Sequence, residues 1–228
     1  VIVRKKKYNL HWLNIYKNCF LTKWDIIIDF RSSLISYLLI NGSKFIFKKN
    51  TNFHHLNQLS NLFKFDCSKL NIYNSVRETE EADYKIDKNF KHVVIHPGGN
   101  WLPKLWPSNC FNKIIKAIHK EYNNVKFIIV GSLKEKDYLY EFVTKDINEK
   151  NIIDLMGASL TLTSAYMKKS NLFIGNDSGL MHLSTASHLK TIGLFGPTND
   201  RIYAPKGEDC FVIRTKESYE HFLKNIID

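Results

Sequence analysis

Residues 171–200 contain two short apolar runs, and each run ends in a polar turn that contains glycine. Residues 172–174 lead into Gly-Asn-Asp-Ser-Gly at 175–179, and residues 191–195 lead into Gly-Pro-Thr at 196–198. A helix-like stretch separates the two. The order strand, turn, helix, strand, turn is typical of a parallel α/β unit. Because ligands bind beyond the carboxyl ends of the strands in such sheets, we expect both turns to border one site.

The same alternation extends along most of the chain. Apolar runs that predict parallel strands lie at residues 92–95, 125–130, 152–155, 172–174, 191–195 and 211–213. The clearest of the helices between them follows Pro107. There Ser108 is the expected N-cap, and apolar residues from Phe111 to Tyr122 recur at helical spacing. We therefore expect an α/β chain with a complete Rossmann-like domain of six parallel strands over residues 92–215 and a C-terminal helix over residues 216–228.

The first 70 residues predict fewer elements. We expect a helix at residues 8–20, a buried strand at 24–30, a helix at 31–40, a strand at 44–47 and a helix at 51–63. Two strands are too few to close a doubly wound sheet. Residues 1–70 are therefore interpreted as part of a second Rossmann-like domain whose remainder lies outside this chain. Residues 71–91 are polar and charged and are predicted to be a linker, with an exposed loop inside one domain as the alternative.

Charge and cysteine content limit the classes of protein. The chain has 33 Lys and Arg against 22 Asp and Glu, a formal net charge of +11. This charge suits nucleic acid, an anionic membrane surface or phosphorylated substrates, but no nucleic-acid-binding motif accompanies it. No run of about 18 apolar residues predicts a transmembrane helix, and the N-terminal residues do not have the order of a secretory signal. The four cysteines lack the spacing of a metal or redox site, so we expect a reduced, cytoplasmic protein.

The turn after the apolar run at 172–174 carries the first group of candidate residues. Asp177 and Ser178 stand where a strand passes into a helix, and His182 lies one helical turn after Ser178. The alternative to ligand binding is structural. An ordinary helix N-cap would explain either Asp177 or Ser178, and a structural role would explain His182. Gly179 lets the backbone approach a ligand closely.

A second group lies in the loop at residues 96–107, which reads His-Pro-Gly-Gly-Asn-Trp-Leu-Pro-Lys-Leu-Trp-Pro. Gly98 and Gly99 expose backbone amides that can bind an anion, and Lys104 can place a positive charge beside phosphate oxygens. The loop matches neither the Walker A motif nor the dinucleotide fingerprint G-x-G-x-x-G. We expect Trp106 to pin the loop to the domain.

Three further strand ends complete the predicted rim of the sheet. The Thr198 hydroxyl and its neighbouring amides can hold a diphosphate, although a plain β-turn explains the same residues. Gly131, Met156 and Ala158 follow two other strands and are weaker candidates for a nucleobase or ribose pocket. The sequence shows no metal-binding cluster, so Lys side chains, backbone amides and helix dipoles would have to neutralise a bound phosphate.

Three of these segments, in this order, resemble glycosyltransferase family 9, the lipopolysaccharide heptosyltransferases and their relatives. They are the loop at residues 96–107, the stretch Gly-Asn-Asp-Ser-Gly-Leu-Met-His at 175–182 and Leu-Phe-Gly-Pro-Thr at 194–198. Together they cover about residues 92–200, and the middle segment is quite specific. Residues 24–33 also resemble a strand and helix late in that family's N-terminal domain.

The resemblance implies a GT-B fold, with two Rossmann-like domains and the donor bound mainly by the C-terminal one. It implies an inverting, metal-independent glycosyltransferase without a cofactor, which moves a sugar from a nucleotide-diphospho-sugar, ADP-heptose above all, to a lipid-linked acceptor of the lipopolysaccharide-core type. It also implies residue roles by position: Gly98, Gly99, Lys104 and Thr198 at the donor phosphates, and Asp177, Ser178, Gly179 and His182 around the donor sugar. The expected location is the cytoplasm, with the anionic inner face of the cytoplasmic membrane as a peripheral partner.

One departure from the family's pattern concerns catalysis. The family has an N-terminal Gly-Asp loop whose Asp is the expected general base. No such loop precedes Trp24, and Asp25 and Asp29 lie within a strand of different context. We therefore expect the general base in a segment that this chain lacks, with donor binding retained. A nucleotide-sugar-binding module without turnover and a basic nucleic-acid-binding protein are the alternative functions, and the missing glycine fingerprint disfavours a nicotinamide-dependent oxidoreductase.

Overall fold

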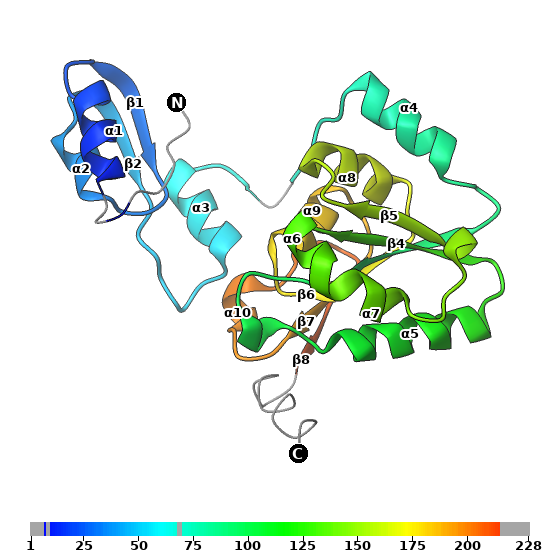
Figure 1. The fold of residues 1–228 in the computed structure, drawn as a ribbon. Helices are drawn as coiled ribbons and strands as arrows, with labels where there is room; N and C mark the ends of the chain where they lie inside the picture. The colour runs from blue at the N-terminus through cyan, green and yellow to red at the C-terminus, as the bar shows by residue number, and fades with distance from the viewer. Residues whose placement is uncertain (1–6, 8–9, 68–69, 215–228) are drawn as a thin grey trace. The chain divides into compact units, whose positions relative to one another are not determined.

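The computed structural model describes residues 7, 10–67 and 70–214 of the 228-residue chain. The chain divides into two compact units, residues 1–67 and residues 68–228 (Figure 1). The helix expected at residues 216–228 lies outside the described residues. The larger, C-terminal unit contains all of the candidate binding residues.

A six-stranded parallel sheet forms the centre of the C-terminal unit. Its strands, in spatial order, are β5 (Ile152–Met156), β4 (Val125–Gly131), β3 (Lys91–His96), β6 (Leu172–Asn176), β7 (Thr191–Phe195) and β8 (Cys210–Arg214). Every adjacent pair in this order is parallel. The six parallel strands predicted from the apolar runs are therefore confirmed, each at the expected place in the chain.

Helices cover both faces of the sheet (Figure 1). The longer helices here are α4 (Val76–Lys85), α5 (Ser108–Glu121), α8 (Leu160–Lys168) and α9 (Gly179–Ala186). The short elements are η2 (Leu102–Lys104), α6 (Leu133–Glu135), η3 (Lys136–Tyr140), α7 (Glu141–Thr144), η4 (Glu149–Asn151) and α10 (Asp200–Tyr203). Because successive strand residues point to opposite faces, Val94 packs in the core beneath α4, α8 and α9, whereas Val93 and Ile95 pack in the core beneath α5 and α7.

The strand order has a topological switch point between β3 and β6. Counted from β3 as the first strand of the sheet, the order is 3-2-1-4-5-6, which is the arrangement of the dinucleotide-binding fold. The chain builds outward from β3 through β4 and β5, and then returns to place β6 on the opposite side of β3. In such sheets ligands bind at this point, beyond the carboxyl ends of the two strands where the order reverses.

The polar stretch at residues 71–91, predicted to be a linker, contains the ten-residue helix α4. Ser75 caps α4, and the fully buried Ala82 and the neighbouring Ile86 belong to the same core cluster as β3, β4 and α8. Neither a linker nor an exposed loop therefore describes residues 76–85. The charged composition is that of an amphipathic helix, which exposes its acidic side chains and packs the few apolar ones.

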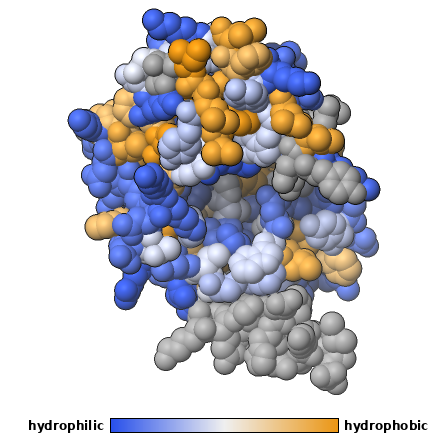
Figure 2. Space-filling model, turned by 90° about the vertical axis from the view of Figure 1, so that its left-hand side faces the viewer, coloured by the Kyte–Doolittle hydropathy of each residue, from blue (hydrophilic) through white to orange (hydrophobic). Residues whose placement is uncertain are grey.

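The N-terminal unit is built on two parallel strands. It contains α1 (His11–Cys19), β1 (Trp24–Asp29), α2 (Leu34–Leu38), β2 (Asn41–Ile46) and α3 (His55–Phe63), and β1 pairs with β2. The prediction that residues 24–30 form a buried strand is wrong about burial, since Ile26 is 58% and Ile28 is 51% exposed. Among the described residues β1 has a single strand neighbour, so these side chains lack the packing that a central strand receives. Figure 2 shows apolar side chains at the surface of one face of the molecule in orange.

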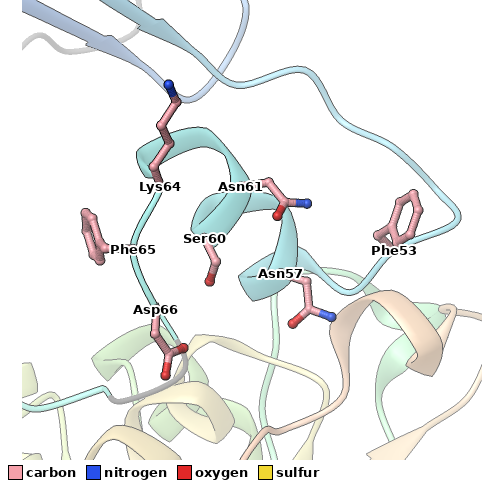
Figure 3. Close-up of a pocket in the computed structure, with 7 residues that line it drawn as sticks. All are labelled: Phe53, Asn57, Ser60, Asn61, Lys64, Phe65 and Asp66. Carbon is pink, nitrogen blue, oxygen red and sulfur yellow. The ribbon is translucent and has the colours of Figure 1, made fainter.

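An open pocket of about 740 Å³ lies beside α3 in the N-terminal unit (Figure 3). The residues that line it are Phe53, Asn57, Ser60, Asn61, Lys64, Phe65 and Asp66. All of them belong to the N-terminal unit, and none is a candidate from the sequence. This pocket therefore shares no residue with the rim of the six-stranded sheet.

The starts of α5 and α2 differ from those predicted. Ser108 was expected as the N-cap of α5, but Pro107 occupies that position and no side chain caps the helix. A proline suits a helix entrance because the terminal N–H groups have no intrahelical acceptor. The helix expected at 31–40 starts later and is shorter, because the Asp29 carboxylate accepts hydrogen bonds from the N–H groups of Arg31 and Ser33 and holds them in a turn.

Candidate functional site

Asn176, the last residue of β6, joins that strand to the loop after β3. Its Nδ2 donates hydrogen bonds to the carbonyl oxygens of Pro97 at 2.9 Å and Gly98 at 3.2 Å. Its Oδ1 accepts a hydrogen bond from the N–H of Trp106 at 3.0 Å. The side chain is fully buried. Both ends of the loop are therefore fixed to β6, a role for Asn176 that the sequence motif alone did not reveal.

Two candidate residues from other loops, Lys104 and Thr198, contact a third candidate, Asp177. Its Oδ2 accepts a hydrogen bond from Lys104 Nζ at 2.7 Å and another from Thr198 Oγ1 at 2.7 Å. Asp177 is only 5% exposed, whereas Lys104 is partly open to solvent. The structure thus brings together the loop after β3, the turn after β6 and the turn after β7. In this arrangement the charge of Lys104 is balanced by Asp177, which was not anticipated from the sequence.

Ser178 is the N-cap residue of α9. Its Oγ accepts a hydrogen bond from the N–H of Met181 at 3.4 Å and lies 3.0 Å from His96 Nδ1. The N-cap explanation therefore applies to Ser178 and not to Asp177. Burial lowers the pKa of His96 to about 4, against the opposing effect of the Glu135 carboxylate, so the ring is neutral at pH 7.

Glu135 is absent from the sequence-based candidates, yet its carboxylate lies against the loop after β3. Its Oε2 accepts hydrogen bonds from the N–H of Ser132 at 2.6 Å and from Ser132 Oγ at 2.8 Å. Burial raises the pKa of Glu135. The two Ser132 hydrogen bonds, the attraction of His96 and the Gly99 N–H outweigh burial and leave this pKa below its ordinary value. The Ser-x-x-Glu pattern at 132–135 is a capping-box signature that could have drawn attention to it.

Gly98 and Gly99 occupy positions at which a side chain would collide with its neighbours. A Cβ on Gly98 would lie 2.3 Å from Glu135 Oε1, and a Cβ on Gly99 would lie 2.9 Å from Leu105 Cδ2. Gly179 differs, since a Cβ there would meet no heavy atom within 4 Å. A side chain at Gly98 would therefore displace the held Glu135 carboxylate, and one at Gly99 would displace the end of the Leu105 side chain, whereas Gly179 opens onto free space at the start of α9.

Gly131, Met156 and Ala158 lie at the ends of β4 and β5, on the other side of β3 from Asp177. The carbonyl oxygen of Gly131 accepts a hydrogen bond from the N–H of Gly157 at 2.7 Å. A Cβ on Gly131 would lie 2.7 Å from Met156 Cε, so the methionine packs directly over that glycine. These candidates form a second group on the same rim rather than part of the Asp177 cluster.

The remaining residues that the sequence singled out are His182 and Trp106. His182 is half-buried in the first turn of α9, and its N–H donates to the carbonyl oxygen of Ser178 at 3.4 Å. The ring of Trp106 packs edge-on against Phe111, with 5.2 Å between ring centroids. This contact confirms that Trp106 pins the loop after β3. Trp101, in contrast, is exposed.

Two arginines border the turn after β7. Arg214 Nη1 donates a hydrogen bond to the carbonyl oxygen of Thr198 at 2.9 Å and also pairs with Asp200. A pocket of about 500 Å³ beside this turn is lined by Pro197, Asn199, Asp200, Arg201 and Arg214. The edge of the rim beyond Thr198 therefore carries positive charge.

Within the part of the chain that the structure describes, no three His, Cys, Asp or Glu side chains gather as metal ligands. No helix formed by those residues has the length and apolar character needed to cross a membrane. Cys19, Cys67, Cys110 and Cys210 are free thiols.

Comparison with known sequences places these features in a family. A sequence model described as glycosyltransferase family 9 (heptosyltransferase) matches residues 51–225. The chain is 34% identical over 116 residues to lipopolysaccharide heptosyltransferase 1 of Campylobacter coli, a match that covers 50% of this chain and 34% of the relative. It is 26% identical over 194 residues to lipooligosaccharide heptosyltransferase 2 of Campylobacter jejuni, covering 78% of this chain and 60% of that protein. The chain thus spans less than two thirds of the length of either relative.

Solved structures show the same fold. The glycosyl transferase family 9 protein from Veillonella parvula matches 99% of this chain and 74% of its own, with 20% identity and a TM-score of 0.72. The E. coli heptosyltransferase WaaC, solved with ADP, matches 94% of this chain and 75% of its own, with 12% identity and a TM-score of 0.65. The fold is therefore α/β with a parallel sheet, similar to that of the GT-B heptosyltransferases.

Proposed function

The chain belongs to glycosyltransferase family 9, and from that premise we propose that it provides the donor-binding part of a sugar-transferring enzyme. The donor we propose is a nucleotide-diphospho-sugar, ADP-heptose in the first place, and the acceptor is a lipid-linked saccharide of the lipopolysaccharide-core type. The reaction inverts the anomeric centre and uses no metal ion. The two relatives named as heptosyltransferases and the neighbour solved with ADP support this choice of donor.

The meeting of Lys104, Asp177 and Thr198 at the topological switch point is the observation that carries this proposal. A nucleoside diphosphate needs a cation and several hydrogen-bond donors in one place. Lys104 supplies the cation. The Thr198 hydroxyl donates to Asp177 in this structure and would turn to the phosphate. Gly98 and Gly99 carry no side chain, so a ligand can approach their backbone closely. We assign the donor phosphates to these four residues.

The donor sugar is assigned to the other side of the same cluster. Asp177, Ser178, Gly179 and His182 all lie at the end of β6 or in the first turn of α9. Gly179 leaves free space there, which a sugar ring can occupy. Gly131, Met156 and Ala158, at the ends of β4 and β5, are assigned to the nucleobase and ribose. The donor would then extend along the rim from β5 to β7.

Transfer without a metal ion requires the protein to stabilise the leaving diphosphate. Lys104 lies between solvent and the buried Asp177 carboxylate, so a diphosphate that binds Lys104 gains a cation whose position is already fixed. Preorganised donors of this kind are worth about 3–4 kcal/mol each in the transition state. Asp177 keeps Lys104 in place and presents a negative charge towards the sugar, where positive charge develops as the glycosidic bond breaks.

Binding of the acceptor and removal of its hydroxyl proton are not assigned to the C-terminal unit. We propose that the N-terminal unit is part of the acceptor-side Rossmann-like domain. We also propose that the general base lies in the part of the full-length relatives that this chain does not match. On this view the chain binds donor but transfers it slowly, because loss of a general base costs about 10²- to 10⁴-fold in rate. A nucleotide-sugar-binding module without turnover is the alternative, and an activity assay on the full-length gene product separates the two.

Calorimetric titration with ADP, GDP and UDP tests the donor site. We expect micromolar binding of one nucleotide and a loss of at least about tenfold in Lys104→Ala, since a hydrogen bond to a charged group contributes about 1.5–3 kcal/mol. Lys116→Ala is the matched control, because Lys116 also pairs with an aspartate, Asp146, at 3.0 Å but on the exposed surface of the same unit. Equal affinities of both variants, or no binding of any nucleotide by the wild-type chain, would contradict the proposal.

We further propose that the protein works in the cytoplasm at the inner face of the membrane, where its net charge of +11 suits anionic lipid and a phosphorylated acceptor. Flotation with anionic liposomes at low and high salt measures this. Binding to DNA or RNA that persists in Lys104→Ala and falls steeply with salt would instead favour the nucleic-acid alternative.

A further inference from the structure

Two helices of the C-terminal unit begin with a capping box of the same sequence pattern, and the two boxes differ in burial. Ser75 and Glu78 form one at the start of α4, where Glu78 is partly exposed to solvent. Ser132 and Glu135 form the other at the start of α6, where Glu135 is only 9% exposed. Burying a carboxylate costs free energy, and the box at α4 shows that capping does not require it. The burial of Glu135 therefore indicates a role beyond capping α6.

The loop after β3 lies directly on the buried carboxylate. A Cβ on Gly98 would be 2.3 Å from Glu135 Oε1, so only a glycine leaves room there. The N–H of Gly99 also interacts with this carboxylate. The carboxylate thus contacts the loop with one oxygen while its other oxygen is held by Ser132.

We propose that Glu135 is a positioning residue that fixes the backbone of Gly98 and Gly99 in the conformation that receives the donor diphosphate. This inference rests on the proposed function for the identity of the ligand. Glu135 is not itself a phosphate ligand, because a carboxylate repels a diphosphate. Its contribution passes through the loop, which Asn176 holds independently at the carbonyl oxygens of Pro97 and Gly98 and at the N–H of Trp106. Two anchors, from β6 and from the turn after β4, then define one loop conformation.

Amide hydrogen exchange on the whole chain tests this without any ligand. In Glu135→Ala we expect exchange at residues 98–100 to increase at least about tenfold, because the loop loses one of its two anchors. Glu78→Ala removes the same type of cap from α4 and should leave exchange at 98–100 unchanged. Equal behaviour of the two variants would overturn the proposal and leave Glu135 as a helix cap only.

A double-mutant cycle tests the contact itself. Gly98→Ala alone should lower the melting temperature strongly, since its methyl group would meet the carboxylate. In the Glu135→Ala background that obstacle is gone, so the same substitution should cost clearly less. Additive effects of the two substitutions would show that the loop does not rest on Glu135, and would overturn the proposal.

Nucleotide affinity links the contact to function. If the wild-type chain binds ADP, Glu135→Ala should weaken binding at least about tenfold and Glu78→Ala less than about twofold. Unchanged affinity in Glu135→Ala would overturn the positioning role. If the wild-type chain binds no nucleotide, the proposed function fails, and exchange together with the double-mutant cycle still decides whether Glu135 holds the loop.

Discussion

β1 and β3 have equal length, each belongs to a parallel sheet of its own unit, and each contains three consecutive β-branched residues. In β3 these residues, at 93–95, are almost completely buried. In β1 two of the three isoleucines at 26–28 are more than half exposed. β3 has a strand on each side and helices over both faces, whereas within the described residues β1 pairs only with β2. Burial is therefore a property of what surrounds a strand and not of the apolar run itself.

The ends of strands differ in the same way. Asp29 closes β1 and binds the chain two to four residues further on, through Arg31 and Ser33. Asp177 follows β6 and binds Lys104 and Thr198, which are 73 and 21 residues away. One carboxylate shapes a local turn, and the other joins loops from three strands. In the described part of the chain, it is thus the C-terminal unit that has an edge at which distant residues form a site.

The largest expected effect concerns the cores. Ile128→Ala, at a fully buried position in β4, should destabilise the chain by about 2–5 kcal/mol, because the lost side chain leaves a cavity. Ile28→Ala removes the same atoms from a position that is 51% exposed and should cost less than about 1 kcal/mol. Urea unfolding followed by circular dichroism measures both. Similar costs would mean that β1 is buried in solution and would remove the contrast between the units.

A smaller effect is expected from the two strand-end aspartates. Asp177→Ala leaves Lys104 without its counter-ion and should lower local stability by about 1.5–3 kcal/mol. Amide hydrogen exchange should then be faster by about 10- to 150-fold. The increase should appear in two distant segments, the loop after β3 and the turn after β7. Asp29→Ala should raise exchange only at residues 31–33. A local response to Asp177→Ala would show that the three loops are held together by other contacts.

An effect of similar size is the pH dependence expected from His96. Its pKa in the folded chain, about 4, is below the unfolded value of about 6.5, so protons bind the unfolded chain more tightly. Burial of the neutral His96 ring therefore costs no free energy of deprotonation above about pH 6.5. Below that pH the unfolded chain gains a proton on His96, and the folded state loses stability as the pH falls towards 4.

Between pH 7 and 4.5 this loss should reach about 2 kcal/mol in the wild-type chain and disappear in His96→Asn. Burial also lowers the pKa of His55 in the N-terminal unit, but by less, so His55→Asn should change the pH dependence less. Unfolding midpoints of the wild-type chain and of both variants, at four or five pH values, measure these changes. Equal changes in the two variants would show that the two histidines experience similar environments.

Much of the fold was predictable from local pattern. The apolar runs at 125–130 and 191–195 become β4 and β7, because strands buried on both faces need continuous apolar sequence. That Lys104, Asp177 and Thr198 would lie near one another followed from placing parallel strands side by side. Their mutual hydrogen bonds did not follow, since partner choice depends on side-chain positions a few ångströms apart.

Other features gave no local signal. Ser75–Glu78 and Ser132–Glu135 have the same capping pattern, and nothing in either sequence indicates which glutamate the fold buries. Asn176 lies inside the recognised motif, but its three hydrogen bonds reach residues at least 70 positions earlier. The helix at 76–85 was not predicted, because the prediction relied on the charged composition of this stretch. It gave too little importance to Ala82 and Ile86, which pack in the core.

The sequence by itself determined the alternation of strands and helices, the parallel sheet and the family, because periodicity and turn chemistry act over a few residues. The tertiary structure alone decided that β1 is exposed, that Asp177 holds Lys104, and that Glu135 lies under the Gly98–Gly99 loop. The physical reason is common to all three. Burial and ion pairing depend on the groups that packing brings within a few ångströms, and those groups come from segments far apart in the chain.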